Sequence, residues 1–246
     1  MESAPALHGV RAAVFDTDGV ITDSARVHAA AWKASFDAFL REHPPEDPYQ
    51  RRPFDVADDY PRLVDGRSRQ DGATAFLASR GIDPDPSLVR AVAADKERRY
   101  TEQLREHGVD AFAGTVRLLN VLRRDGLPLA AASASRHACE LLTRAGVLGL
   151  FDALVDGAQA ARLGLPGKPE PDLFLEAARR LGVPAADTAV FEDALAGVEA
   201  GRRGGFGLVI GVNRTSGQAA GEELRRRGAD LVVRDLGELV VEGAPA

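Results

Sequence analysis

The chain has 246 residues, of which 45% are hydrophobic, and its formal net charge is −6. This length is sufficient for one large domain, or for a core with a second domain inserted into it. The acidic balance argues against nucleic acid as a partner, because phosphate backbones select basic surfaces.

The first predicted element is a short apolar strand over residues 12–15, which is followed at once by two aspartates. Ala-Ala-Val-Phe is too short for a helix and shows no polar alternation, which is typical of a strand buried on both faces of a parallel sheet. Asp16 and Asp18 lie two residues apart, so their side chains should emerge together at the carboxyl end of this strand. Gly19 then permits a sharp turn. In open parallel sheets, ligands bind at this edge.

The next segment, residues 24–111, is predicted to be helical and to contain no strand. Apolar residues recur at helical spacing over residues 24–40. A loop rich in proline and charge follows at residues 42–59, and no strong element is expected in it. From residue 60 to residue 100 the pattern is again helical, with breaks at Gly66 and at residues 81–84. We therefore expect this segment to form a helical cap domain over the catalytic edge.

From residue 112 onward, helices alternate with short apolar strands. The predicted strands cover residues 127–132, 153–155, 188–191, 207–212 and 230–233, and the predicted helices cover residues 115–124, 136–145, 171–181, 195–203 and 218–227. Such alternation is typical of an α/β fold with a doubly wound parallel sheet, to which the opening strand must also belong. The predicted organisation is an α/β core of residues 1–23 and 112–246, with a cap of residues 24–111.

Signals for export or membrane insertion are not found in the sequence. Residues 1–6 lack the basic start and apolar core of a secretory signal. The uncharged run between Asp125 and Arg136 is far shorter than the roughly 20 residues that a spanning helix needs. The single cysteine, Cys139, excludes an internal disulfide, and its helical surroundings predict a small buried residue. We therefore expect a cytoplasmic protein with no membrane partner. We also expect a monomer.

Polar residues gather at the predicted ends of the core strands. Ser133 follows one strand, Glu192 and Asp193 follow another, and Lys168 lies in a nearby loop. Each of them alone could begin a turn or cap a helix. Their joint placement predicts one site together with the two aspartates of the opening strand. Oxygen ligands without Cys or His favour a hard cation, and Mg²⁺ suits them better than Zn²⁺.

The charges of this group favour phosphoryl transfer. Asp16 is the candidate nucleophile that would form an aspartyl-phosphate, and Asp18 is the candidate general acid and base. Lys168 and Ser133, together with Mg²⁺, would bind the phosphoryl oxygens, because this transition state needs positioning and charge neutralisation above all. Asp193, with Glu192 beside it, would hold the metal.

Four segments of the chain resemble the motifs of the haloacid dehalogenase superfamily, and they occur in the same order. They are Asp16-Thr-Asp-Gly-Val-Ile-Thr-Asp, Ser133-Ala-Ser, Lys168-Pro and Glu192-Asp193. The resemblance implies a Rossmann-like core with an inserted cap, catalytic roles for Asp16, Asp18, Ser133 and Lys168, and binding of Mg²⁺ also by the main-chain carbonyl of Asp18. The implied metal ligands are Asp16, Asp18, Glu192 and Asp193.

Further residues resemble the β-phosphoglucomutase-like branch of this superfamily. His28 and Trp32 follow the first motif and share a helical face, and the segment around Gly66 resembles a cap loop that grips the phosphate not being transferred. The alternative to a substrate-binding role is that His28 is an ordinary interdomain histidine and Trp32 a core tryptophan. A planar guanidinium suits a phosphate grip. The implied substrate-binding residues are His28, Trp32, Gly66, Arg67, Arg69, Ala134 and Arg136.

Two departures from the branch pattern leave the substrate open. Asp65 stands where the branch has a lysine, and Ala194 stands where a small polar residue commonly follows Glu-Asp. A Mg²⁺-dependent sugar-phosphate mutase that converts β-glucose 1-phosphate to glucose 6-phosphate is the first interpretation. The alternative is a sugar-phosphate phosphatase of the same fold. A receiver-like phospho-signalling module is more remote, because such modules have about half this length and carry no inserted cap.

Overall fold

The computed structural model describes residues 2–214 and 217–241, and the chain divides into two compact units. The core unit comprises Met1–Asp23 and Asp110–Ala246, and the helical unit comprises Ser24–Val109. Residues 1, 215–216 and 242–246 of the predicted core lie outside the described residues. The assignment of the helical unit as a cap stays a prediction.

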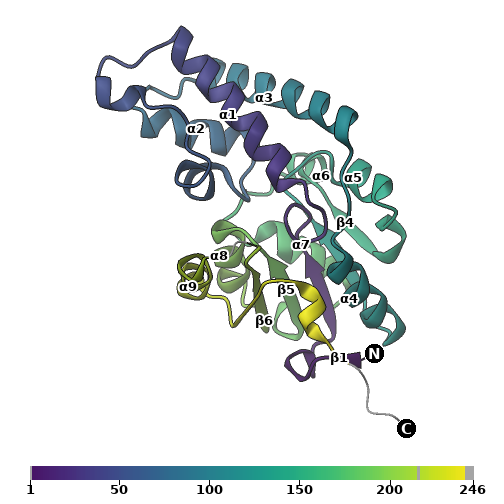
Figure 1. Cartoon of the computed structure of the whole chain (residues 1–246). Coiled ribbons are helices and arrows are strands. Elements are labelled where there is room, and N and C mark those ends of the chain that lie inside the picture. Colours follow the sequence, from purple (N-terminus) through teal and green to yellow (C-terminus); the bar gives the residue numbers. More distant parts are fainter. Residues whose placement is uncertain (1, 215–216, 242–246) are drawn as a thin grey trace. The chain divides into compact units, whose positions relative to one another are not determined.

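The core unit is built on a six-stranded parallel sheet with the order β4-β3-β2-β5-β6-β7. Figure 1 labels the strands β4, β5 and β6 of this sheet. The strands are β2 (Ala12–Phe15), β3 (Leu129–Ala132), β4 (Ala153–Val155), β5 (Thr188–Glu192), β6 (Leu208–Val212) and β7 (Leu231–Val233). The opening strand lies at the centre, between β3 and β5, where every residue of β2 is buried. The predicted α/β fold with a parallel sheet is confirmed, because the expected strands all pair in this sheet.

The register of the central strands divides the core into two apolar layers. Val14 pairs with Val190 and packs under α7, α8 and α9, whereas Phe15 pairs with Phe191 and faces the layer that contains α4. The rings of Phe15 and Phe191 stack with their centroids 4.2 Å apart. The helices of this unit are α4 (Ala113–Arg124), α5 (Ala138–Arg144), α6 (Gly157–Leu163), α7 (Asp172–Leu181), α8 (Leu195–Arg203) and α9 (Gln218–Arg227).

Three features of the core unit differ from the sequence analysis. The helix α6 was not expected, nor was the antiparallel pair β1 (Glu2–Ser3) and β8 (Val240–Val241). Short 3₁₀ turns also occur at Pro5–Leu7, Leu148–Leu150, Ala185–Asp187 and Leu236–Leu239. The prediction that Cys139 is buried is wrong, because its thiol is exposed. In α5 the neighbouring Ala138 faces inward with Leu141, and one residue further turns the side chain by about 100° toward solvent.

The helical unit packs around aromatic side chains. Its elements are α1 (Ala25–Glu42), a 3₁₀ turn (Pro48–Arg51), a π-helical turn (Tyr60–Val64), α2 (Arg69–Ser79) and α3 (Pro86–His107). Phe36 of α1 is fully buried and stacks on Phe76 of α2 with a centroid distance of 3.7 Å. No helix in the described part of the chain combines the length and the apolar character needed to cross a membrane.

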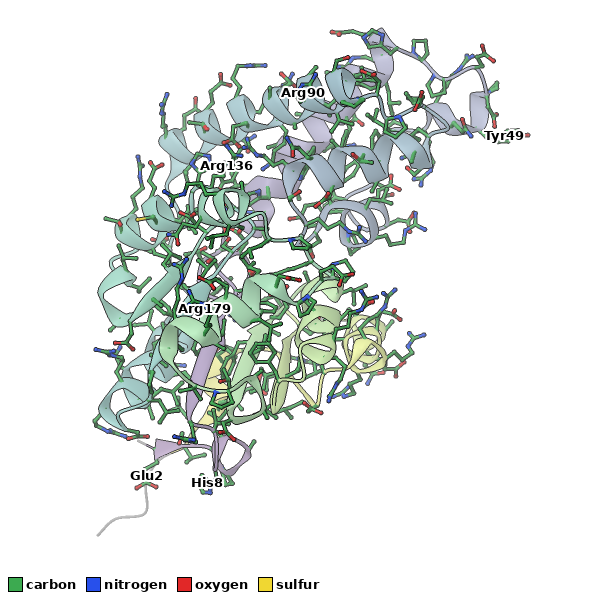
Figure 2. All side chains as sticks on the ribbon, turned by 180° about the vertical axis from the view of Figure 1, so that it is seen from behind. Glu2, His8, Tyr49, Arg90, Arg136 and Arg179 are labelled. Atoms are coloured by element: carbon green, nitrogen blue, oxygen red, sulfur yellow. The ribbon has the colours of Figure 1, made fainter. Side chains whose placement is uncertain are left out.

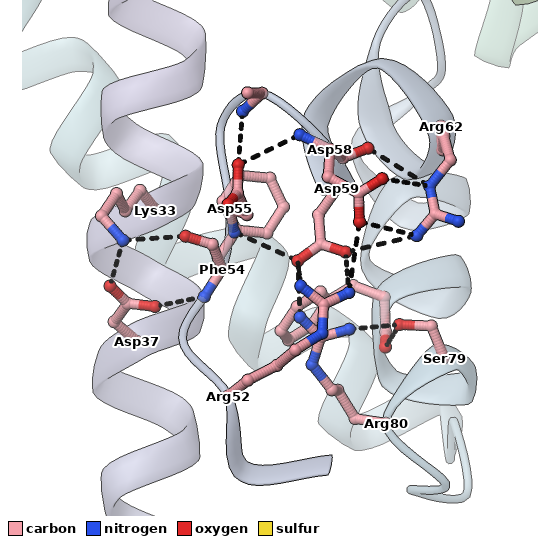
Figure 3. A network of polar contacts seen from close by, with 12 residues as sticks. Lys33, Asp37, Arg52, Phe54, Asp55, Asp58, Asp59, Arg62, Ser79 and Arg80 are labelled. Carbon is pink, nitrogen blue, oxygen red and sulfur yellow. Dashed lines mark hydrogen bonds and ion pairs between the residues drawn. The ribbon is translucent and has the colours of Figure 1, made fainter. Parts of the chain in front are cut away.

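The proline-rich loop of residues 42–59 is held to the helical unit by polar contacts (Figure 3). Asp37 of α1 accepts a hydrogen bond from the main-chain N–H of Phe54, at 2.7 Å, and Lys33 donates to the Phe54 carbonyl. At the end of the loop, the fully buried Asp59 pairs with the Arg80 guanidinium at 2.5 Å. The tip is different, since Tyr49 is 90% exposed and points outward (Figure 2).

Candidate active site

The site begins at the carboxyl end of the central strand β2. The main-chain N–H of Asp16 continues the ladder by donating to the carbonyl of Phe191 at 2.9 Å, and this leaves the Asp16 carboxylate buried at the strand end. One of its oxygens, Oδ2, accepts a hydrogen bond from the N–H of Asp18 at 2.9 Å. Gly19 follows with φ +79°, and a Cβ there would collide with the Asp193 carboxylate. The glycine therefore permits both the turn and the close approach of Asp193.

Lys168 brings a buried positive charge to Asp16. Its Nζ lies 2.5 Å from Asp16 Oδ1 and 3.1 Å from Glu192 Oε2, and it also lies 4.6 Å from the centroid of the Phe174 ring. Burial lowers the pKa of Lys168, but the carboxylates of Asp16 and Glu192 outweigh it, so the net direction is upward. The ammonium therefore stays charged at neutral pH and holds the Asp16 carboxylate in one orientation.

Three carboxylates converge at the carboxyl ends of β2 and β5. Asp16, Glu192 and Asp193 each offer an oxygen, and these oxygens lie within 4.8 Å of one another. Burial raises the pKa of Asp16, Lys168 lowers it and Asp18 raises it, and the net direction is upward. A bound divalent cation would reverse that direction by adding positive charge. The donor set, which consists of oxygens alone, fits a hard cation such as Mg²⁺.

Ser133 reaches the same edge from the neighbouring strand β3. Its N–H donates to the Val155 carbonyl at 2.9 Å, and its hydroxyl lies 3.5 Å from Asp18 Oδ2. The Ser133 side chain is fully buried, whereas Arg136 further along the loop is exposed (Figure 2). Ala134 packs its carbonyl against Gly157, where a Cβ would collide with it. The core-unit residues that were predicted to form the site thus lie on adjacent strand ends and their loops.

In the helical unit, Trp32 and His28 occupy different environments. Trp32 is 4% exposed and stacks on Phe36, with centroids 4.7 Å apart, within the apolar core of that unit. His28 stacks on Tyr100, and its Nδ1 lies 2.8 Å from the ammonium of Lys96. A substrate role for either residue stays a prediction.

Lys96 was missed in the sequence analysis. It is 1% exposed, and its ammonium lies 4.4 Å from the centroid of the Tyr100 ring and 5.4 Å from that of the Trp32 ring. The signal was present, since Lys96 continues the helical stripe of Val89, Val92 and Tyr100, all of which are buried. A lysine within an apolar stripe is unusual, because a buried charge needs specific partners.

The two arginines predicted to bind the phosphate that is not transferred, Arg67 and Arg69, have different environments. Arg69, at the start of α2, pairs with Glu97 of α3 at 2.5 Å, and both side chains are about three-quarters buried, with 28% and 25% exposed. Arg67 is half-buried next to Gly66, which adopts φ +68°. Among the described residues, no ion pair is found for Arg67. The Glu97 carboxylate was not foreseen, because its contact joins two separate helices.

A family model described as haloacid dehalogenase-like hydrolase matches residues 10–205, which include the whole carboxylate cluster and Lys168. The chain belongs to this family. The superfamily assignment made from the four motifs is therefore confirmed, as is the prediction of an enzyme of the phosphotransferase or phosphatase type.

Curated relatives of this haloacid dehalogenase-like hydrolase include mutases. A protein from Mycobacterium tuberculosis named "Beta-phosphoglucomutase" is 44% identical over 94% of this chain and 92% of its own length. A Bacillus subtilis protein of the same name is 32% identical over 95% of this chain and 93% of its own length. Among solved structures, a hydrolase from Pseudomonas syringae is similar, with a TM-score of 0.75, 26% identity, and coverage of 93% of this chain and 95% of that chain.

Proposed function

We propose that this enzyme is a Mg²⁺-dependent β-phosphoglucomutase, which converts β-glucose 1-phosphate to glucose 6-phosphate through an aspartyl-phosphate. The observation that carries the chemistry is the contact of Lys168 with Asp16, at 2.5 Å, beside two further carboxylates. The 44% identity to a relative named as this mutase, over most of both chains, supports the substrate. The proposed partner is thus a small sugar phosphate.

In the proposed reaction, Asp16 attacks the phosphorus atom and becomes the aspartyl-phosphate. Its carboxylate is already oriented, because Oδ1 accepts from Lys168 and Oδ2 accepts from the N–H of Asp18. Lys168 neutralises charge on the transferring phosphoryl oxygens. As the P–O bond to the sugar breaks, Asp18 donates a proton to the leaving sugar oxygen. In the second transfer Asp18 accepts the proton of the sugar hydroxyl that attacks the aspartyl-phosphate, and the Asp16 carboxylate leaves. Ser133, within 3.5 Å of the Asp18 carboxylate, is placed to bind a phosphoryl oxygen.

The carboxylates of Asp16, Glu192 and Asp193 would hold the metal. When bound, Mg²⁺ would polarise the phosphoryl oxygens and offset the repulsion between the carboxylates. Glu192 also has a second task, since its Oε2 accepts from Lys168 and its Oε1 from the N–H of Ala194 at 3.3 Å. It therefore orients Lys168 as well as contributing charge.

Chelation of divalent metal should abolish turnover of β-glucose 1-phosphate, and added Mg²⁺ should restore it. Asp193→Asn should raise the Mg²⁺ concentration for half-maximal activity by about tenfold or more, because the ion loses a charged ligand. The matched control is Asp187→Asn, which removes an exposed carboxylate that pairs with Arg11. Equal Mg²⁺ titrations for both variants would contradict the metal site.

Arg69→Ala should impair the mutase reaction far more than the hydrolysis of p-nitrophenyl phosphate. The physical reason is that a sugar bisphosphate carries a second phosphate group, which a guanidinium can bind, whereas the aryl ester carries none. We expect kcat/KM for the mutase reaction to fall on the order of 100-fold. Arg90→Ala on α3, an exposed arginine, is the control. Equal losses in the two reactions would argue against a second phosphate grip at Arg69.

A phosphatase is the second candidate function, and a specific contact favours it. The Glu97 carboxylate neutralises the Arg69 guanidinium, and Asp65 adds a negative charge in the loop before α2. Both charges weaken the binding of a second phosphate group at Arg69. The deciding experiment supplies Mg²⁺, β-glucose 1-phosphate and a trace of glucose 1,6-bisphosphate. Glucose 6-phosphate as the product supports the mutase. Free glucose and inorganic phosphate would establish the phosphatase instead.

A further inference from the structure

Arg214 makes contacts with the turn that follows the two aspartates of β2. It lies in the loop after β6, and its side chain is only 21% exposed. Its Nε donates to the carbonyl of Gly19 at 3.0 Å, and one terminal nitrogen donates to the carbonyl of Val20 at 3.2 Å. Arg214, which is distant in the sequence, is thus hydrogen-bonded to the backbone directly after Asp18.

Asp235 and the ring of Phe112 hold the guanidinium of Arg214 in place. Its other terminal nitrogen pairs with Asp235 at 2.6 Å, and the guanidinium carbon lies 3.6 Å from the centroid of the Phe112 ring. Asp235 is itself fixed, because it caps the turn Leu236–Leu239 and accepts from the N–H of Gly237 at 2.7 Å. The guanidinium therefore has a fixed position from which it can restrain the turn.

The turn itself is closed by a small set of hydrogen bonds. The N–H groups of Ile21 and Thr22 both donate to the carbonyl of Thr17, at 3.0 and 2.9 Å, and the N–H of Gly19 donates to the carbonyl of Thr22 at 2.8 Å. The hydroxyl of Thr115 adds a bond to the Val20 carbonyl at 2.7 Å. Asp18 lies inside this closed turn, so a shift of the turn must move Asp18.

We propose that Arg214 is a positioning residue, which sets the place of Asp18 by holding the carbonyls of Gly19 and Val20. This inference rests on the proposed function for the role of Asp18 as acid and base. Arginine suits the task, because its planar fork can donate to both carbonyls and to Asp235 while its face stacks on Phe112. A lysine has no fork and no planar face, so it can reproduce only part of this arrangement.

The first test compares Arg214→Met with Arg202→Met. Arg202 is a matched control, because it also donates to a main-chain carbonyl, that of Gly228 at 2.7 Å, and to an aspartate, Asp230, but none of these contacts involves the turn. In Arg214→Met we expect kcat to fall on the order of 10- to 100-fold with KM changed less than about threefold, since a displaced acid/base group affects the chemical step. Arg214→Lys should recover part of this loss.

The second test measures amide hydrogen exchange in the segment of residues 16–24, which needs no turnover. Arg214→Met should speed exchange at the N–H groups of Gly19, Ile21 and Thr22 on the order of tenfold, and Arg202→Met should leave them unchanged. Unchanged exchange in Arg214→Met would overturn the proposed restraint. Faster exchange with a kcat no lower than that of Arg202→Met would overturn the link to Asp18. If the wild-type protein turned over no phosphate ester, the proposed function would fail, while the exchange rates would still decide whether Arg214 restrains the turn.

Discussion

Asp16→Asn should leave the fold intact and reduce turnover of β-glucose 1-phosphate by a factor on the order of 10⁴ or more. An amide has no anionic oxygen with which to attack phosphorus, so the aspartyl-phosphate cannot form. The substitution keeps the side-chain volume, and its one oxygen can still accept the hydrogen bond that the N–H of Asp18 makes at 2.9 Å. The buried ammonium of Lys168 keeps a counter-charge, because the Glu192 carboxylate lies 3.1 Å from it. The fluorescence of Trp32, the single tryptophan, together with circular dichroism, should therefore match the wild type.

The intermediate itself can be tested by mass spectrometry. Wild-type protein that is quenched in acid during turnover should carry one phosphoryl group on the peptide that contains Asp16, and Asp16→Asn should carry none. Asp187→Asn, which alters an exposed surface carboxylate, should behave as the wild type. Retained turnover in Asp16→Asn, or a phosphoryl group on another residue, would rule out Asp16 as the nucleophile.

Asp59→Asn should destabilise the helical unit by about 3–5 kcal/mol, because it leaves the buried guanidinium of Arg80 without its counter-charge. Asp59 is fully buried and accepts from Arg80 at 2.5 Å, from Arg52 at 2.7 Å and from the N–H of Asp55 at 3.1 Å (Figure 3). Asparagine keeps the volume of the side chain, so the loss reports on charge and hydrogen bonding and not on a cavity.

Urea unfolding followed by the fluorescence of Trp32 measures this effect, because Trp32 lies in the apolar core of the helical unit. The control is Asp58→Asn. Asp58 is 56% exposed and contacts Arg62 at 3.3 Å, so its removal should cost less than about 1 kcal/mol. Similar decreases in the free energy of unfolding for the two variants would show that the buried pair of Asp59 and Arg80 stabilises this unit no more than an exposed pair does.

The pH dependence of unfolding gives an independent check on Asp59. Burial raises the pKa of Asp59, but hydrogen bonds from Arg80, the Asp55 main chain and Arg52 outweigh it, so the net direction is downward. A carboxyl whose pKa is lower in the folded state contributes stability above its unfolded pKa of about 4 and loses it as the pH falls through the folded value. The wild type should therefore lose stability below about pH 4 more steeply than Asp59→Asn does.

Local sequence patterns were sufficient for the parallel sheet and for the centre of the site. The strand β2 begins and ends where the apolar run of residues 12–15 does, because a strand buried on both faces must be continuously apolar. The same pattern located β5, which ends at Glu192 and is followed directly by Asp193. Parallel strands place their carboxyl ends at one edge, so the convergence of the carboxylates with Asp16 followed from topology alone.

Only the tertiary structure revealed the contacts that join distant segments. The burial of Lys96 beside His28, the pairing of Arg69 with Glu97 and the attachment of Arg214 to the turn after Asp18 each link separate elements. The exposure of Cys139 depended on the phase of a short helix, which composition does not define. Apolar burial leaves a periodic trace along the chain, because it acts on whole faces of helices and strands. A single ion pair leaves none, because it depends on where two side chains from different elements meet in space.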